Sequence, residues 1–87
     1  MTSREIIEYL EEQNPEAILF DGLEHALVGV GSQYPNPPVA IYEVNKILQV
    51  LQKEDGMDAD EAQEWYDFNI GCLYAGEHTP IIMDYMR

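Results

Sequence analysis

The apolar residues of this chain occur in short segments, and glycine or proline follows each of them within a few residues. The breaks fall at Pro15, Gly22, the proline-rich run 35–38, Gly56, Gly71 and Gly76. Proline disfavours a helical residue before it, and glycine accepts the left-handed backbone that ends a helix. The chain is therefore limited to short helices and strands, and no apolar run approaches the roughly 20 residues of a membrane span.

The clearest helix is predicted in EVNKILQVLQKEDG, residues 43–56. Val44, Ile47, Leu48 and Leu51 follow the spacing i, i+3, i+4, i+7, which places them on one helix face. Gly56 then supplies a left-handed stop.

Two other helices have capping signals. Thr2 with Glu5, and Asp58 with Glu61, are spaced as in a capping box, which indicates that a helix starts after Thr2 and another after Asp58. A further short helix is predicted over PEAILFDGLEHAL, residues 15–27, with Gly22 as its weak point.

The segments ALVGVGSQY (26–34) and PVAIYEV (38–44) flank the turn-forming run PNPP and predict an antiparallel hairpin. Gly29 and Gly31 on the first strand indicate a bulge or a close backbone approach. A last strand is predicted in TPIIMDYM, residues 79–86. We expect residues 1–87 to form one small α+β domain, with three to four helices on a short antiparallel sheet. Its expected core includes Ile47, Leu48, Leu51, Tyr66 and Leu73.

The net charge is −13, from 17 acidic and four basic residues, Arg4, Lys46, Lys53 and Arg87. Such a balance repels nucleic acid and anionic lipid, so direct binding of either is not expected. The acidic N-terminus does not resemble a signal peptide, and the single Cys72 rules out a disulfide within the chain. We expect a cytoplasmic protein with Cys72 buried and inert.

PPVAIYEVNKILQVL (37–51) and DGMDADEAQEWYDFNIGCLYAGEHTPIIM (55–83) resemble a family of small acidic proteins from tailed phages, prophages and bacteria. The resemblance extends from Pro15 to Met83. The family has no assigned biochemical activity, so the resemblance provides no functional residues. It implies a phage or mobile-element setting, with the host cell cytoplasm as the compartment, where small acidic proteins often bind host or defence proteins.

Motifs for catalysis are weak, and the sequence predicts no catalytic residue, no metal and no cofactor. Asp21, His25, Glu77 and His78 are residue types that bind divalent ions. Their spacing is generic, however, so a metal-assisted enzyme is the least favoured interpretation.

Acidic residues cluster on the helix after Asp58, and a second row follows the first helix. The sequence predicts an acidic binding face of Asp60, Glu61, Glu64 and Asp67, and a secondary row of Glu5, Glu8 and Glu12. Like charges three or four residues apart on a helix destabilise it by a few tenths of a kcal/mol per pair. The helix dipole offsets this only in the first turn, so Glu64 and Asp67 call for another reason.

Three aromatic residues, Trp65, Tyr66 and Phe68, lie in the same segment and cannot all point inward from one helix. We expect one of them to reach a second surface. Either the helix is sandwiched between the sheet and a neighbouring helix, or the second surface is a patch for self-association or for a partner. The favoured hypothesis is a non-enzymatic protein that binds a basic protein through its acidic face, in its sharpest form a nucleic-acid mimic or anti-defence inhibitor. The alternative is a small homo-oligomeric structural or accessory protein, such as a homodimer, whose acids only increase solubility.

Overall fold

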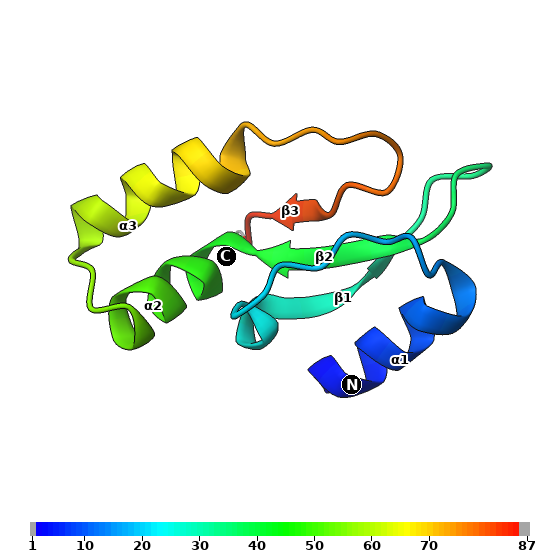
Figure 1. Ribbon diagram of the computed structural model, residues 1–87, viewed down its shortest axis with the longest axis horizontal. Coiled ribbons are helices and arrows are strands. Elements are labelled where there is room, and N and C mark those ends of the chain that lie inside the picture. Colours follow the sequence, from blue (N-terminus) through cyan, green and yellow to red (C-terminus); the bar gives the residue numbers. More distant parts are fainter. Residues whose placement is uncertain (1, 86–87) are drawn as a thin grey trace.

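The computed structural model describes residues 2–85 of the chain, and these contain three α-helices and one three-stranded sheet (Figure 1). The elements are α1 (Ser3–Gln13), the 3-10 turn η1 (Glu24–Ala26), β1 (Leu27–Gly31), β2 (Val39–Glu43), α2 (Val44–Glu54), α3 (Ala59–Tyr66), the π turn η2 (Asp67–Gly71) and β3 (Ile81–Met83). Along the long axis α1 lies toward one end and the α2–α3 pair at the other (Figure 1). The predicted α+β class is confirmed.

The strand order is β1-β2-β3, and the first pair is the predicted antiparallel hairpin. The prediction of a purely antiparallel sheet is wrong, because β3 pairs with β2 in parallel, with Ile41 beside Ile81 and Glu43 beside Met83. The reason is the connection: α2 and α3 together return the chain to the start of β2, as a parallel pair requires. The last strand is also shorter than predicted, and Met86 lies outside the described residues.

The bulge that the sequence indicated forms at the first of the two glycines of β1, whereas Gly31 is approached by side chains rather than by another backbone. The pairing with β2 shifts between Leu27 and Gly29, which marks an irregularity of the bulge type. A Cβ atom at Gly31 would lie 3.0 Å from the Cδ1 atoms of both Ile41 and Ile81. The missing side chain at Gly31 therefore leaves space for isoleucines from both other strands.

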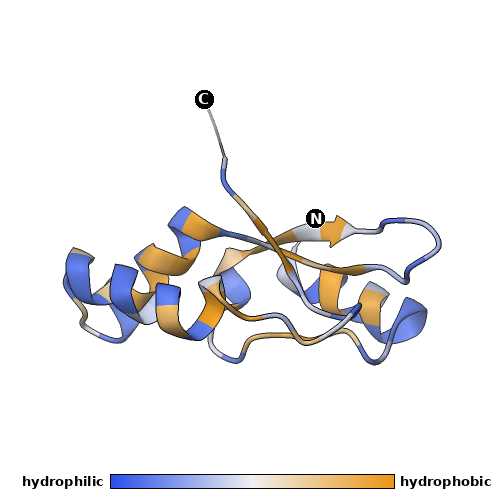
Figure 2. Cartoon of the chain, turned by 90° about the horizontal axis from the view of Figure 1, so that it is seen from above, coloured by the Kyte–Doolittle hydropathy of each residue, from blue (hydrophilic) through white to orange (hydrophobic). Residues whose placement is uncertain are grey.

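The core lies between the helices and one face of the sheet, and apolar residues follow the strands and the inner helix faces (Figure 2). Its largest fully buried side chains are those of Ile6, Leu10, Tyr42, Ile47 and Leu51. The hydroxyl of Tyr42 accepts a hydrogen bond from the Phe20 N–H at 2.9 Å. Burial raises the pKa of Tyr42 above its ordinary value, because a phenolate is poorly solvated there.

The predicted core is correct for Ile47 and Leu51, and Leu48 and Tyr66 are partly buried against it. The prediction that Leu73 belongs to the core is wrong, since this residue is 39% exposed. Cys72 is also exposed, contrary to the expected buried thiol. Both follow η2 in the stretch that leads to β3, where the chain has left the helix pair that covers the core.

Local signals place the helix ends correctly. Both capping boxes form, because the Thr2 and Asp58 side chains accept from the N–H groups of Glu5 and Glu61, whose carboxylates accept in return. The hydrogen bonds from Thr2 lower the pKa of the Glu5 carboxyl. Gly56 has φ +70°, the left-handed conformation expected after α2.

The helix predicted over 15–27 is wrong apart from the short turn η1. Gly22, at φ +83°, breaks the segment, and the part before it is extended or turned. The Ile18 N–H donates to the carbonyl of His78 at 3.2 Å, and Phe20 donates to Tyr42. These tertiary hydrogen bonds use backbone donors that a helix would have satisfied internally.

Candidate acidic and aromatic surface of α3

The outer face of α3 carries the predicted acidic residues, and the structure leaves Asp60, Glu61, Glu64 and Asp67 all exposed. Residues three or four apart share a helix face, so the four carboxylates follow one side of α3 into η2. No Lys or Arg occurs between Glu54 and Met86 in the sequence. This face therefore has no basic residue of its own segment to neutralise it.

Two aromatic side chains border these carboxylates. Trp65 is 37% and Phe68 80% exposed, and both line a shallow hollow of about 340 Å³. The hollow is lined by Met57, Glu61, Glu64, Trp65, Phe68 and Asn69. We call this set, together with Asp60 and Asp67, the acidic–aromatic surface.

The opposite side of the helix explains why these aromatics face outward. Ala62 and Ile70 are buried in the core, and Tyr66 packs against it. Burial, and then the negative charges of Asp84 and Asp67, raise the pKa of Tyr66. Because the inner side is filled, Trp65 and Phe68 are left toward solvent. The prediction that the three aromatics cannot all point inward is confirmed, and no neighbouring helix of residues 2–85 covers Phe68.

Hydrogen bonds hold three residues of the acidic–aromatic surface. Glu61 belongs to the capping box, Asp67 accepts from the Gln63 amide at 3.0 Å, and the Asn69 amide donates to the Trp65 carbonyl at 2.9 Å. Glu64 makes no side-chain hydrogen bond or ion pair within residues 2–85. Its carboxylate, at the hollow, is therefore available to an external cation.

The secondary acidic row does not join this surface. Glu5 is part of the α1 capping box, and Glu8 forms an ion pair with Arg4, with 3.4 Å between Oε1 and Nε. Glu12 is exposed near the end of α1. Both views place α1 and α3 apart along the long axis (Figures 1 and 2), so the structure does not bring the two rows together.

The histidines considered as metal ligands lie in different settings. His78 contacts the Asn14 amide at 3.1 Å, and its Nε2 lies 3.4 Å from Glu16 and 3.7 Å from Glu77. His25 lines a separate pocket with residues of α2. Asp21 is not on a common helix with His25, because the chain turns at Gly22. Across residues 2–85 no three His, Cys, Asp or Glu side chains are grouped to hold a metal ion.

No helix among the described residues combines the length and apolar character of a membrane span. Comparison with protein-family models, curated proteins and solved structures gives no match for this chain. The resemblance to small acidic phage and bacterial proteins accordingly stays a prediction from the sequence.

Proposed function

We propose that this chain is a non-enzymatic binding protein that engages a basic protein partner through the acidic–aromatic surface. The observation that carries the proposal is the position of Phe68 and Trp65 beside Glu61 and Glu64 around one hollow. A surface that only increases solubility gains nothing from a phenylalanine that is 80% exposed. Tryptophan and tyrosine are favoured anchors where proteins bind each other, and aromatic residues in general are enriched there.

A basic side chain of the partner suits this hollow chemically. An arginine or lysine that enters it meets the Glu64 carboxylate, which has no partner in the described chain, together with the rings of Trp65 and Phe68. A cation over an aromatic face gains about 0.5–2 kcal/mol, more as water is excluded. The remaining carboxylates, Asp60 and Asp67, act at the rim, where charge mainly accelerates association.

The sharpest form of the proposal is a nucleic-acid mimic. Carboxylates that follow one helix side at close spacing compete with phosphates for a basic groove, so the partner would be a nucleic-acid-binding protein of the host or of its defence. The bacterial or phage-infected cytoplasm as the setting rests on the sequence resemblance. Competition between the chain and DNA or RNA for the captured partner would separate this form from other kinds of binding.

Self-association is the second candidate, and two further residues favour it. Tyr74 and Tyr34 are 81% and 96% exposed, which adds aromatic area that a second copy could cover. A net charge of −13 acts against such contacts, because two copies repel each other. Sedimentation velocity at low and high salt separates the candidates, since a dimer held by aromatics strengthens as salt screens the repulsion.

The test of the proposed function is the triple variant Glu61→Gln, Glu64→Gln and Asp67→Asn, assayed against a partner captured from host lysate. Each amide keeps an oxygen acceptor, so the capping bond from Asp58 and the bond from Gln63 to position 67 persist. The free energy of unfolding should stay within about 0.5 kcal/mol of the parent value. We expect binding to be lost or to show a slower on-rate with a weaker salt dependence.

The matched control is Glu8→Gln, Glu11→Gln and Glu12→Gln, which removes the same charge from α1. We expect this control to keep most of the on-rate. A second variant, Phe68→Ser, tests the aromatic part and should increase the off-rate without changing the salt dependence. Equal loss of binding in both charge variants would show that net charge alone drives association and would contradict the proposed surface.

A further inference from the structure

Two of the few basic residues of this chain have no acidic partner in the part of the chain that the structure describes. Arg4 is paired with Glu8, but neither Lys46 nor Lys53 forms an ion pair with any carboxylate of residues 2–85. Both lysines thus stay unpaired although the chain has 17 Asp and Glu residues. Arg87 lies outside the described residues.

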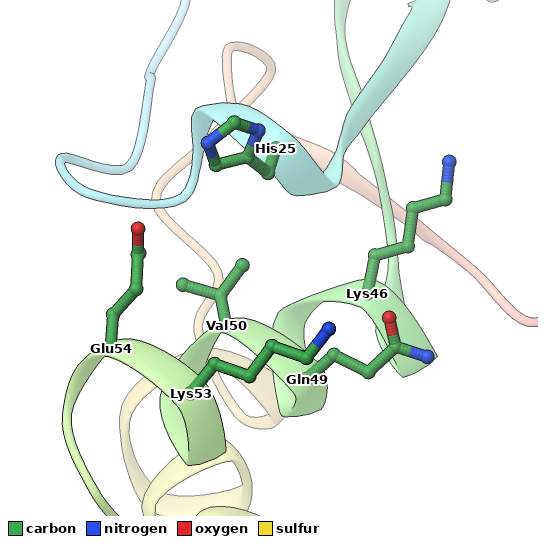
Figure 3. A pocket seen from close by; sticks show the side chains of 6 residues that line it. All are labelled: His25, Lys46, Gln49, Val50, Lys53 and Glu54. Carbon is green, nitrogen blue, oxygen red and sulfur yellow. The ribbon is translucent and has the colours of Figure 1, made fainter.

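Both lysines line the same pocket, which has a volume of about 490 Å³ (Figure 3). Lys46 and Lys53 are seven residues apart on α2 and therefore share a helix face, with Gln49 and Val50 between them. His25 of η1 faces them from the other wall, and Glu54 lies at one end. No residue of α3 lines this pocket, so it is distinct from the acidic–aromatic surface.

The side chains in the pocket form a polar wall over an apolar floor. Lys53 runs back along α2 toward Gln49, while the imidazole of His25 lies above Val50 (Figure 3). Val50 is 8% exposed and belongs to the core, which fixes the floor of the pocket. The pocket thus offers two ammonium groups, an amide and an imidazole around a small apolar area, with the carboxylate of Glu54 at the end away from Lys46.

We propose that this pocket binds a small organic dianion, such as a phosphate monoester, with the charged group between Lys46 and Lys53 and the apolar part over Val50 and His25. Lysine ammoniums bind phosphate as point charges, and two of them match a double negative charge. The volume lies in the range of roughly 300–1,000 Å³ that is usual for small-molecule sites. The net charge of −13 repels a long polyanion, which restricts the site to a small ligand.

The experiment is an amide-resolved NMR titration in a buffer of low ionic strength without phosphate. Phenyl phosphate is the probe, and benzyl alcohol is its neutral counterpart. We expect saturable shifts at His25 and along Lys46–Glu54 with phenyl phosphate, at concentrations up to about 10 mM, which covers a millimolar Kd. Inorganic phosphate should shift the same amides more weakly, because it lacks the apolar part.

Three single variants, each losing one positive charge, identify the site. Lys46→Gln and Lys53→Gln should each weaken the affinity for phenyl phosphate severalfold, and the double variant by at least about tenfold, or 1.4 kcal/mol. Arg4→Gln removes the same charge from α1 and should leave the affinity within about twofold. Both lysines are exposed, so the variants should keep the parent melting temperature, which is measured alongside.

Four results of the titration, and a fifth concerning the oligomeric state, would overturn the proposal. The first four are an absence of shifts up to the highest concentration, shifts that do not concentrate around His25 and α2, equal binding of benzyl alcohol, and unchanged affinity in the double lysine variant. A concentration-dependent oligomer that the double variant abolishes would also overturn it, since the pocket would then hold an acidic segment of a second copy.

Discussion

At the scale of single residues, Asn14 is the buried polar group that joins separate parts of the chain. It is 5% exposed, and its Nδ2 donates to the Pro38 carbonyl at 2.8 Å and to the Nδ1 of His78 at 3.1 Å. Because Nδ1 of the His78 imidazole accepts this hydrogen bond, the ring proton is on Nε2. The Nε2–H group of His78 therefore faces Glu16 and Glu77. One amide thus fixes the end of α1, the 32–38 connection and the loop before β3.

Replacing Asn14 with alanine should destabilise the protein by about 1–3 kcal/mol, because the Pro38 carbonyl loses its donor in a partly buried setting. Urea unfolding measures this loss, and Gln13→Ala, at an exposed neighbouring position, should change stability by less than about 0.5 kcal/mol. Nitrogen-15 NMR of the parent should report the Nε2–H tautomer of His78. A loss of stability no larger than that of the control would remove Asn14 from this role.

Residue-level predictions succeeded where a local rule applied and failed where burial depended on distant contacts. The caps at Thr2 and Asp58 need only their own helix, and the sequence therefore indicated them. Cys72 and Leu73 were assigned to the core from their apolar character alone. No local sequence pattern indicates that the chain leaves the α2–α3 pair at that point.

At the scale of elements, a strong apolar periodicity was sufficient to predict a helix and its bounds. Segments with mixed signals were predicted incorrectly. The apolar stripe of 44–51 gave α2 with its bounds nearly correct. Residues 15–27 do not form the predicted helix, because the backbone N–H groups of Ile18 and Phe20 donate hydrogen bonds to partners distant in the sequence. The direction of β3 was missed for a similar reason, since it depends on how α2 and α3 turn the chain back.

The packing of the three strands at Gly31 gives a prediction for the sheet. Gly31→Val should destabilise the protein by about 1–3 kcal/mol, because its branched side chain has to displace both Ile41 and Ile81. Gly29→Val is the matched control in the same strand, since a Cβ at Gly29 meets no atom within 4 Å. Thermal unfolding of both variants checks the difference. Similar melting temperatures would show that the isoleucines move aside at little cost.

At the scale of the whole molecule, the sequence predicted the exposure of the acidic residues on α3 but did not predict the pocket between η1 and α2. Carboxylates on a helix after a clear cap are expected to be exposed, and Asp60, Glu61, Glu64 and Asp67 are. The pocket needs η1 to bring His25 opposite Lys46 and Lys53, and η1 occupies a segment where a longer helix was expected. The only local signal was the spacing of the two lysines on one face of α2.

The net charge of −13 leads to a last prediction, for stability against salt. At about 0.01 M ionic strength the Debye length is roughly 30 Å, comparable with the dimensions of 38 × 27 × 25 Å of the described part. Carboxylates across the whole fold therefore repel one another, more strongly than in the expanded unfolded chain. Among residues 2–85 only one ion pair that involves Lys or Arg, Arg4–Glu8, is present for salt to weaken.

Raising sodium chloride from about 0.01 M to about 1 M at pH 7 should therefore increase the melting temperature, because the Debye length falls to roughly 3 Å. Each kcal/mol of relieved repulsion should raise the melting temperature by about 4–8 °C for a domain of this size. The same titration at a pH of about 4 should give a smaller increase, since Asp and Glu are then partly protonated. An equal increase in melting temperature at both pH values would assign the effect to a general action of salt on apolar burial. A larger increase at pH 7 than at about pH 4 measures the repulsion between carboxylates that this acidic chain tolerates in order to fold.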